Sequence, residues 1–210
     1  MTAATHDPEL TRLWLVRHGE PGAEIRGRCY GRLDAGLSPV GRRQIERVAR
    51  ELAATKFAAI YASPRKRTRE SAEIIASAQG ASIRVHEPFR EIDFGDFEGM
   101  SYDDIARRFP AEYQQWMSNP TGVQFPNGES FAAMQERVLR ATQDLLVAHA
   151  GETIAIITHG GVNRILLAHA LGMPSVNLFR IGQGYAARNL IQQVGDYLSV
   201  ELMNQLPEQS

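Results

Sequence analysis

The sequence contains a single cysteine, only two lysines and no long apolar run. One cysteine excludes an internal disulfide framework and any zinc site built from several cysteines. Because no run of about 18 apolar residues occurs, the sequence predicts no membrane-spanning helix. We therefore expect a protein of a reducing compartment, the cytoplasm, that does not enter a membrane.

A net charge of one sign is also missing. The 23 basic residues nearly balance the 24 acidic residues, which gives a formal net charge of -1. Such a chain has no overall field to attract nucleic acid or an anionic membrane, so neither is an expected partner. An anion site must be built locally. Of the basic residues 21 are arginines, whose planar guanidinium binds phosphate or carboxylate through paired hydrogen bonds.

The length and composition are typical of one globular domain. The chain has 210 residues, of which 43% are hydrophobic and 22% are charged. It shows no internal repeat and no low-complexity linker. We expect residues 1–210 to form a single domain in which residues 1–12 are a loose N-terminal extension. A homodimer is the default assembly.

Short apolar runs alternate with amphipathic segments along the chain, and two Ser-Pro pairs are typical helix starts. The pattern predicts strands at 13–16, 58–61, 82–86, 153–157, 190–194 and 197–202, and helices at 38–54, 63–79, 129–150 and 162–171. Residues 88–126 are less regular and predict a small cap insertion with short helices. This alternation predicts an α/β fold, a three-layer α/β/α sandwich with a mostly parallel central sheet.

Histidine and glycine follow two of the expected strands, and in the first case an arginine precedes the histidine. Arg17-His18-Gly19 come directly after the first strand, and His159-Gly160-Gly161 come after the fourth. The glycines let the backbone approach a ligand closely. Arg67 lies in the first turns of the second helix, whose N-terminus favours anions. Because parallel strands bind ligands at their carboxyl ends, these residues predict a phosphate pocket.

Four motifs follow one another along the chain. They are Leu15-Val16-Arg17-His18-Gly19-Glu20, Ala62-Ser63-Pro64-Arg65-Lys66-Arg67-Thr68, Arg90-Glu91-Ile92-Asp93-Phe94-Gly95-Asp96-Phe97-Glu98-Gly99 and Thr158-His159-Gly160-Gly161. With these motifs in this order, residues 13–200 resemble the histidine phosphatase superfamily, the phosphoglycerate mutase-like proteins. The resemblance implies the three-layer fold of that family.

The resemblance also implies a mechanism. His18 is the expected nucleophile, which takes the phosphoryl group as a phosphohistidine that water then hydrolyses. Arg17, Arg67 and His159 are expected to hold the phosphoryl oxygens, with His159 counted among the catalytic residues. Glu91 is the expected proton donor to the leaving oxygen. Such a reaction needs no metal ion or other cofactor.

Further residues are expected around the phosphate. Gly19 and Gly160 would bring their backbone to it, and Arg28 matches a loop arginine of the family, with a solvated arginine as the alternative. Glu24 stands where many members have a phosphate-contacting asparagine. Since a carboxylate repels phosphate, we expect Glu24 either to turn outward or to meet a cationic or hydroxyl part of the substrate.

Hydrolysis has two alternatives, a mutase reaction and a non-catalytic phosphate-binding module. Members of the family that are mutases carry a tyrosine three residues after the acid and an arginine pair in a long insertion. Here Phe94 occupies the first position, residues 88–126 are few, and Arg107-Arg108 are expected to be solvated. The sequence therefore favours a phosphatase for a small phosphate monoester.

The identity of that ester stays open. Segments 28–34 and 90–95 are similar to α-ribazole-phosphate phosphatases of cobalamin assembly. Sugar phosphates, phosphoglycerate and nucleotide monophosphates are the alternatives. Among the other polar residues, we expect Ser63 to be a helix cap and Cys29 a core or loop thiol, whereas Glu98 fits a catalytic or an architectural role equally well.

Overall fold

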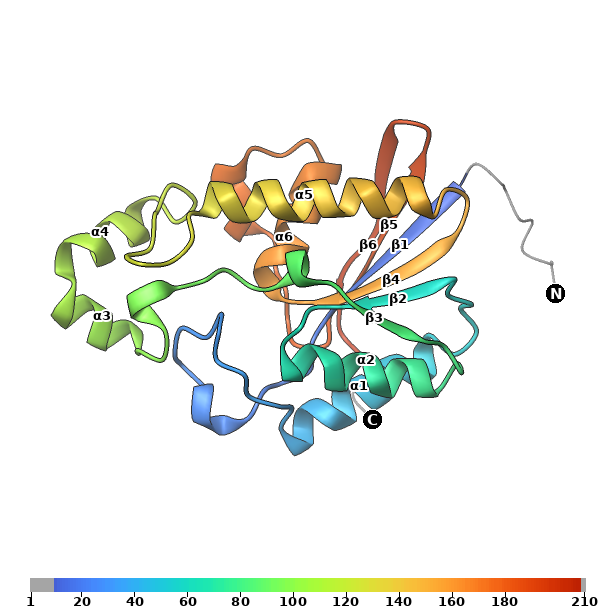
Figure 1. Ribbon diagram of the computed structural model, residues 1–210, viewed down its shortest axis with the longest axis horizontal. Coiled ribbons are helices and arrows are strands. Elements are labelled where there is room, and N and C mark those ends of the chain that lie inside the picture. The colour runs from blue at the N-terminus through green and yellow to red at the C-terminus, as the bar shows by residue number, and fades with distance from the viewer. Residues whose placement is uncertain (1–9, 209–210) are drawn as a thin grey trace.

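A mixed six-stranded sheet forms the centre of the protein (Figure 1), for which the computed structural model describes residues 10–208. The strand order is β3-β2-β4-β1-β5-β6, and β3, β2, β4 and β1 run parallel to one another. The last two strands form an antiparallel hairpin beside β1. The bounds are β1 Leu10–Arg17, β2 Ala59–Ala62, β3 Ile83–Val85, β4 Thr153–Thr158, β5 Arg188–Val194 and β6 Tyr197–Gln205.

Helices cover both faces of the sheet. Helices α1 (Pro39–Glu51) and α2 (Lys66–Ser77) lie on one face, and α5 (Phe131–Ala148) and α6 (Gly160–Ala170) lie on the other. Strand β4 shows the alternation: Ile154 and Ile156 belong to the core under α5 and α6, while Ala155 and Ile157 belong to the core over α1 and α2. Because β4 is buried on both faces, it reads as a continuous apolar run in the sequence.

The cap insertion lies at the left in Figure 1, beyond the end of the sheet. It contains α3 (Tyr102–Arg108) and α4 (Pro110–Ser118). A capping box between Ser101 and Asp104 starts α3, and Pro110 starts α4. Single turns of 3-10 helix complete the chain: η1 Ala23–Ile25, η2 Glu87–Phe89, η3 Gly95–Phe97 and the longer η4 Ser175–Arg180.

The structure confirms the predicted α/β sandwich, and among the element starts the largest differences from the prediction, three residues each, are those of β1 and α2. Strand β1 begins at Leu10, so residues 10–12 belong to the sheet rather than to the expected N-terminal extension, of which residues 1–9 lie outside the described residues. Helix α2 begins at Lys66, three residues after Ser63. Within residues 10–208 no helix is long and apolar enough to cross a membrane.

The start of α1 predicts a stability effect. Ser38 Oγ accepts a hydrogen bond from the Gly41 amide at 3.0 Å and donates one to Glu20 at 3.0 Å. We expect Ser38→Ala to lower the free energy of unfolding by about 1 kcal/mol, as for other lost N-caps. Urea denaturation measures this. Ser77→Ala, at the exposed C-terminal end of α2, is the matched control, and an equal loss in both variants would contradict the capping role.

Candidate active site

The pairing of β1 with β4 brings the two predicted histidines together. Arg17 and Thr158 are opposite each other in this parallel pair, so the next residues, His18 and His159, leave the sheet side by side. Their ring centroids are 5.3 Å apart. The His18 amide donates to the Thr158 carbonyl at 2.9 Å, which holds the end of β1 against β4. Both side chains are almost completely buried.

The hydrogen bonding of His18 leaves one ring nitrogen ready to attack. Its Nδ1 lies 2.7 Å from the Gly19 carbonyl oxygen, and since a carbonyl only accepts, Nδ1 carries the proton. In the neutral ring Nε2 is then the unprotonated nitrogen. Burial, together with the charges of Arg67 and Arg17, holds the pKa of His18 well below its usual value. His18 is therefore neutral and nucleophilic at Nε2.

Two guanidinium groups flank the histidines, that of Arg67 buried and that of Arg17 partly buried. Arg67 is fully buried in α2, and it donates to the carbonyls of Leu33 at 2.7 Å and Tyr30 at 3.0 Å. Arg17 donates to the Gln183 carbonyl, and its guanidinium carbon is 4.2 Å from the centre of the Tyr185 ring. Among the ion pairs of the described residues none involves either arginine. Their positive charge is thus held in place mainly by neutral groups.

Ser63 supports His159 rather than capping a helix, which corrects the prediction. Its Oγ lies 2.7 Å from His159 Nε2, and Arg65 is the residue at the N-cap of α2. Burial and the charge of Arg67 hold the pKa of His159 well below its usual value, so the ring is neutral. Nδ1 is the ring nitrogen without a partner, and in the tautomer that binds an anion Nδ1 carries the proton while Nε2 accepts from the Ser63 hydroxyl. Sequence reasoning missed this contact because a Ser-Pro pair is also a common helix start.

Three buried nitrogens of this cluster have no hydrogen-bond partner: Arg17 Nε, Arg67 Nε and His159 Nδ1. An unpaired buried donor costs roughly 1–3 kcal/mol, so such groups normally have a partner. An anion with several oxygen acceptors satisfies donors of this kind. The donor set therefore fits a phosphate group held next to His18.

Glu91 lies at the N-terminus of α6, on the other side of the cluster. Its Oε2 accepts from the Gly161 amide at 3.1 Å, and its Oε1 accepts from the Ile92 amide at 3.1 Å. Gly161 is needed here because a Cβ at this position would meet Glu91 Oε1 at 2.3 Å. The carboxyl group is thus fixed by backbone donors.

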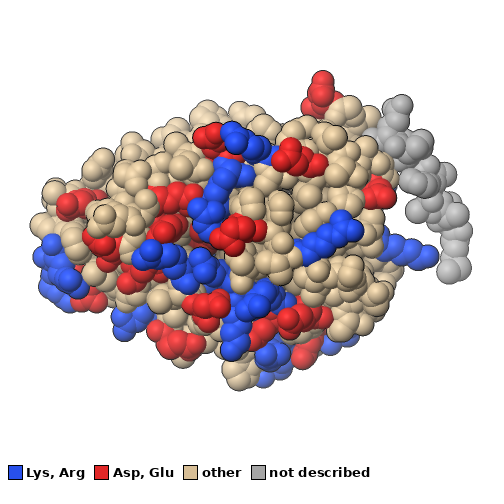
Figure 2. Space-filling view, in the orientation of Figure 1, with Lys and Arg blue, Asp and Glu red and all other residues tan. Residues whose placement is uncertain are grey.

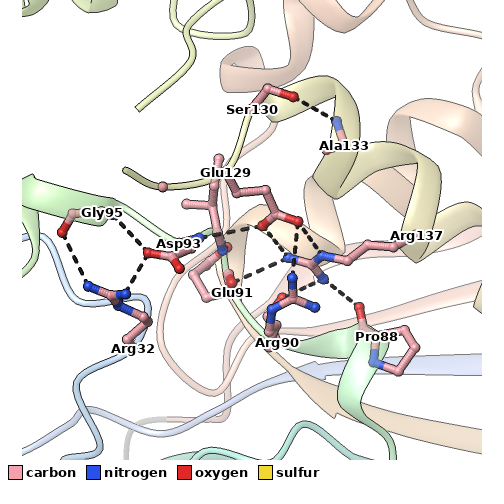
Figure 3. A network of polar contacts seen from close by, with 12 residues as sticks. Arg32, Pro88, Arg90, Glu91, Asp93, Gly95, Glu129, Ser130, Ala133 and Arg137 are labelled. Atoms are coloured by element: carbon pink, nitrogen blue, oxygen red, sulfur yellow. Dashed lines mark hydrogen bonds and ion pairs between the residues drawn. The ribbon is translucent and has the colours of Figure 1, made fainter. Parts of the chain in front are cut away.

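The loop that carries Glu91 is held by the Arg137–Glu129 pair (Figure 3). Arg137 of α5 donates to Glu129 through Nε at 2.7 Å and through Nη2 at 2.8 Å. The same guanidinium donates to the carbonyls of Arg90 at 2.9 Å and Glu91 at 3.3 Å. Both partners are at least 85% buried, since their side chains are 15% and 10% exposed. Arg137 is therefore a positioning residue for Glu91 that the sequence motifs did not indicate.

The segment before β5 contributes to the site although it matched no family motif. Gln183 supplies the carbonyl that binds Arg17, and its side chain joins Asn163 at 3.0 Å and Asn189 at 2.7 Å in a buried amide network. Tyr185 packs on Arg17, and the centroid of its ring lies 5.7 Å from that of the His18 ring. This stretch therefore forms a wall of the site.

Packing gives a reason for glycine at the two predicted positions, Gly19 and Gly160. A Cβ on Gly19 would meet the Gly41 carbonyl oxygen at 2.4 Å, so Gly19 allows close packing of the loop against α1. A Cβ on Gly160 would lie 3.0 Å from Arg164 and 3.5 Å from Arg17. Gly160 therefore leaves space for two guanidinium groups. In both cases the absent side chain makes room for protein atoms.

The remaining predicted residues divide between the site and its framework. Arg28 lines the cavity of His18 and donates to the Gly99 carbonyl at 2.7 Å. Glu98 Oε1 accepts from three backbone amides, two of them at 31 and 32, which favours its architectural role. Glu24 is exposed and thus turns outward. Cys29 is a buried core thiol, as expected, and burial raises its pKa to about 12.

These residues enclose a small cavity of about 150 Å³. Its lining is mainly polar and aromatic: Arg17, His18, Arg28, Cys29, Tyr30, Glu91, Phe94 and Tyr102. Across residues 10–208, no group of three or more His, Cys, Asp or Glu side chains is placed to hold a metal ion. The arrangement can hold an anion, attack it with a neutral imidazole and protonate a leaving group.

Comparison with known proteins agrees with this geometry. A family model described as histidine phosphatase superfamily (branch 1) matches residues 13–206. The chain belongs to this superfamily. The superfamily assignment covers β1 to β6 and all of the site residues described above.

Two curated relatives and one solved structure illustrate the likeness. Phosphoserine phosphatase 1 of Hydrogenobacter thermophilus is 30% identical over 87% of this chain and 86% of its own length. Adenosylcobalamin/alpha-ribazole phosphatase of Escherichia coli is 29% identical over 82% and 86%. The structure of Bacillus stearothermophilus YhfR is 32% identical with a TM-score of 0.88, covering 93% of this chain and 98% of that one. The predicted family and phosphoglycerate mutase-like fold are confirmed, and the relatives are small-molecule phosphatases as expected.

The low pKa of the two histidines predicts their protonation and a pH effect on stability. Histidines of the urea-unfolded chain take up protons as the pH falls below about 6.5. We expect His18 and His159 of the folded, ligand-free protein to stay neutral in that range. Because the unfolded state then binds more protons, the free energy of unfolding must decrease as the pH falls through this range. Histidine ¹⁵N NMR checks the protonation, and a proton on His18 Nε2 at neutral pH would contradict the assigned tautomer.

Proposed function

We propose that the protein hydrolyses small phosphate monoesters through a phosphohistidine formed at His18 Nε2. The observation that carries this proposal is the combination of a neutral buried imidazole with three unpaired buried nitrogens around it. The names of the relatives, which include phosphoserine and α-ribazole phosphatases, support hydrolysis of a small phosphorylated molecule.

In the proposed first step, Nε2 of His18 attacks phosphorus while the bond from phosphorus to the ester oxygen breaks. Arg17, Arg67 and His159 Nδ1 hold the three other phosphoryl oxygens and neutralise their charge. Glu91, in its protonated form, gives its proton to the leaving oxygen, so a neutral alcohol departs.

In the second step Glu91 accepts a proton from water, which attacks phosphorus and breaks the bond to Nε2. Inorganic phosphate is released, and His18 returns to its neutral form with the proton still on Nδ1. The hydrogen bond from Nδ1 to the Gly19 carbonyl stabilises the positive charge of the phosphorylated ring. Neither step requires a metal ion.

The assembly and location remain proposals. We propose that residues 1–210 act as one domain, supported by a family match that spans most of them. On the face shown in Figure 2, acidic and basic side chains are interspersed, which supports the proposal that nucleic acid is not a partner. We also propose a cytoplasmic location, since the only thiol is buried and unpaired. A homodimer is proposed by default.

The nucleophile is tested by phosphate release from nitrophenyl phosphate in the presence of EDTA. We expect release by the wild-type protein and a loss of at least roughly a thousandfold in His18→Ala, because no other group forms the covalent intermediate. His169→Ala replaces an exposed histidine and should retain full activity. Persistent activity in His18→Ala, or its abolition by EDTA in the wild type, would show that the reaction takes another route.

The acid role of Glu91 predicts a dependence on the leaving group. We expect Glu91→Gln to slow hydrolysis of an alkyl phosphate by roughly 10²- to 10⁴-fold, and of nitrophenyl phosphate much less, because nitrophenolate leaves without a proton. The exposed neighbour Glu87 provides the control Glu87→Gln. Equal losses on the two esters would rule out proton donation by Glu91.

A further inference from the structure

A second, larger cavity adjoins the cavity of His18. Its volume is about 370 Å³, and it lies between the cap insertion and the helices α5, α6 and η4. Glu91, Phe94 and Tyr102 line both cavities. The two spaces therefore meet at the carboxyl group that is the proposed proton donor.

The walls of the second cavity are mainly apolar and aromatic. Six aromatic side chains line it: Phe94, Tyr102, Trp116, Phe125, Phe131 and Phe179. Four of them form a connected cluster, with Tyr102 stacked on Trp116 at 5.3 Å and Trp116 edge-on to Phe125 at 5.2 Å between ring centroids. Phe94 joins Phe125 at 5.0 Å. These mutual contacts hold the rings as a preformed surface.

Only two charged side chains, Glu91 and Arg164, line this cavity. The two backbone amides bound to Glu91 fix its carboxyl at the junction with the cavity of His18. Arg164 Nε donates to the Ile181 carbonyl at 2.8 Å, and its guanidinium carbon lies 5.7 Å from the centre of the Phe179 ring. Arg164 therefore forms part of the wall beside an aromatic ring.

The direction of the reaction places the alcohol part of the ester in this cavity. In an in-line displacement the leaving oxygen lies opposite the attacking nitrogen. Glu91 must reach that oxygen to protonate it, and everything bonded to the oxygen extends past Glu91. The space beyond Glu91 is the aromatic cavity.

We propose that the aromatic cavity is the leaving-group subsite, and that the preferred substrates are phosphate monoesters of alcohols that carry an aromatic ring. This inference rests on the proposed hydrolysis at His18 and names the class of ester. A ring would bury its faces against the aromatic cluster while its phosphate reaches the arginines. A small charged alcohol such as serine would leave most of these apolar walls facing water, and its ammonium group would have no anionic partner in the cavity while Glu91 is protonated.

Three alkyl phosphates test the inference, because their leaving alcohols need the same help from Glu91. They are 3-phenylpropyl phosphate, ethyl phosphate and phosphoserine, and the readout is kcat/KM from phosphate release. We expect the phenylpropyl ester to exceed each of the other two by roughly 10- to 100-fold, the range for burial of one ring-sized apolar group. Comparable values for phenylpropyl and ethyl esters, or a preference for phosphoserine, would overturn the subsite.

Variants at the mouth of the cavity connect this preference to its walls. Phe179 and Met117 are 52% and 44% exposed, so replacing them by alanine should leave the fold intact. We expect Phe179→Ala and Met117→Ala each to reduce the ratio of phenylpropyl to ethyl turnover by roughly threefold to tenfold. Val176→Ala is the matched control, since Val176 is 72% exposed on the same short helix as Phe179 and does not line the cavity.

The outcomes separate the inference from the function on which it rests. A ratio that Phe179→Ala, Met117→Ala and Val176→Ala all leave unchanged would overturn the aromatic cavity as the source of the preference, while hydrolysis itself would stand. No phosphate release from any ester, nitrophenyl phosphate included, would overturn the hydrolysis at His18 and the subsite with it.

Discussion

The site depends on positive charge that no direct ion pair neutralises among the described residues, since the carboxyl groups of Glu91 and Asp34 act on Arg67 only from a distance. Arg67 is fully buried, and its hydrogen bonds go to backbone carbonyls, which carry partial charges only. Moving an ion out of water costs several kcal/mol unless other groups compensate for the lost hydration. Burial first, and then the same positive charge, hold the pKa values of His18 and His159 well below the usual value, so both rings are neutral. One arrangement thus attracts a phosphate and preserves the nucleophile that attacks it.

Hydrogen bonds from surrounding polar groups hold these charged side chains and the Glu91 loop in place. The amides of Gln183, Asn163 and Asn189 hold one another in the interior, and the Gln183 carbonyl binds Arg17. On the opposite side Arg137 and Glu129 form a nearly buried bidentate pair that also binds the loop of Glu91. A buried network stabilises a unique geometry only if its members are satisfied. In this protein three of the unpaired buried nitrogens, those of Arg17, Arg67 and His159, lie where the phosphate is proposed to bind, whereas most polar groups of the supporting networks are paired.

Sequence reasoning could reach the fold and the phosphate-binding core because both follow from local patterns. Apolar runs such as 153–157 end at the carboxyl edge of the sheet, and the residues directly after them, His18 and His159, are brought together by strand register. The supporting residues lie far apart in sequence and carry no comparable signal: Arg137 lies in the middle of a helix, and Gln183 lies in a loop. Ser63 was misjudged for a related reason, since the local rule for helix starts ignored its partner 96 residues away.

In the proposed reaction the phosphate-binding core and the cap contact different parts of the ester. His18, Arg17, Arg67 and His159 contact only the phosphoryl group in the proposed reaction, so they are indifferent to the alcohol attached to it. The alcohol meets side chains from the cap, α5, α6 and η4, among them Trp116 and Phe179. These elements lie outside the sheet edge that positions the histidines, so their side chains are able to change without disturbing the strand register. In the proposed reaction, selectivity is therefore determined by the shape and polarity of the cap cavity rather than by the motifs that identify the family.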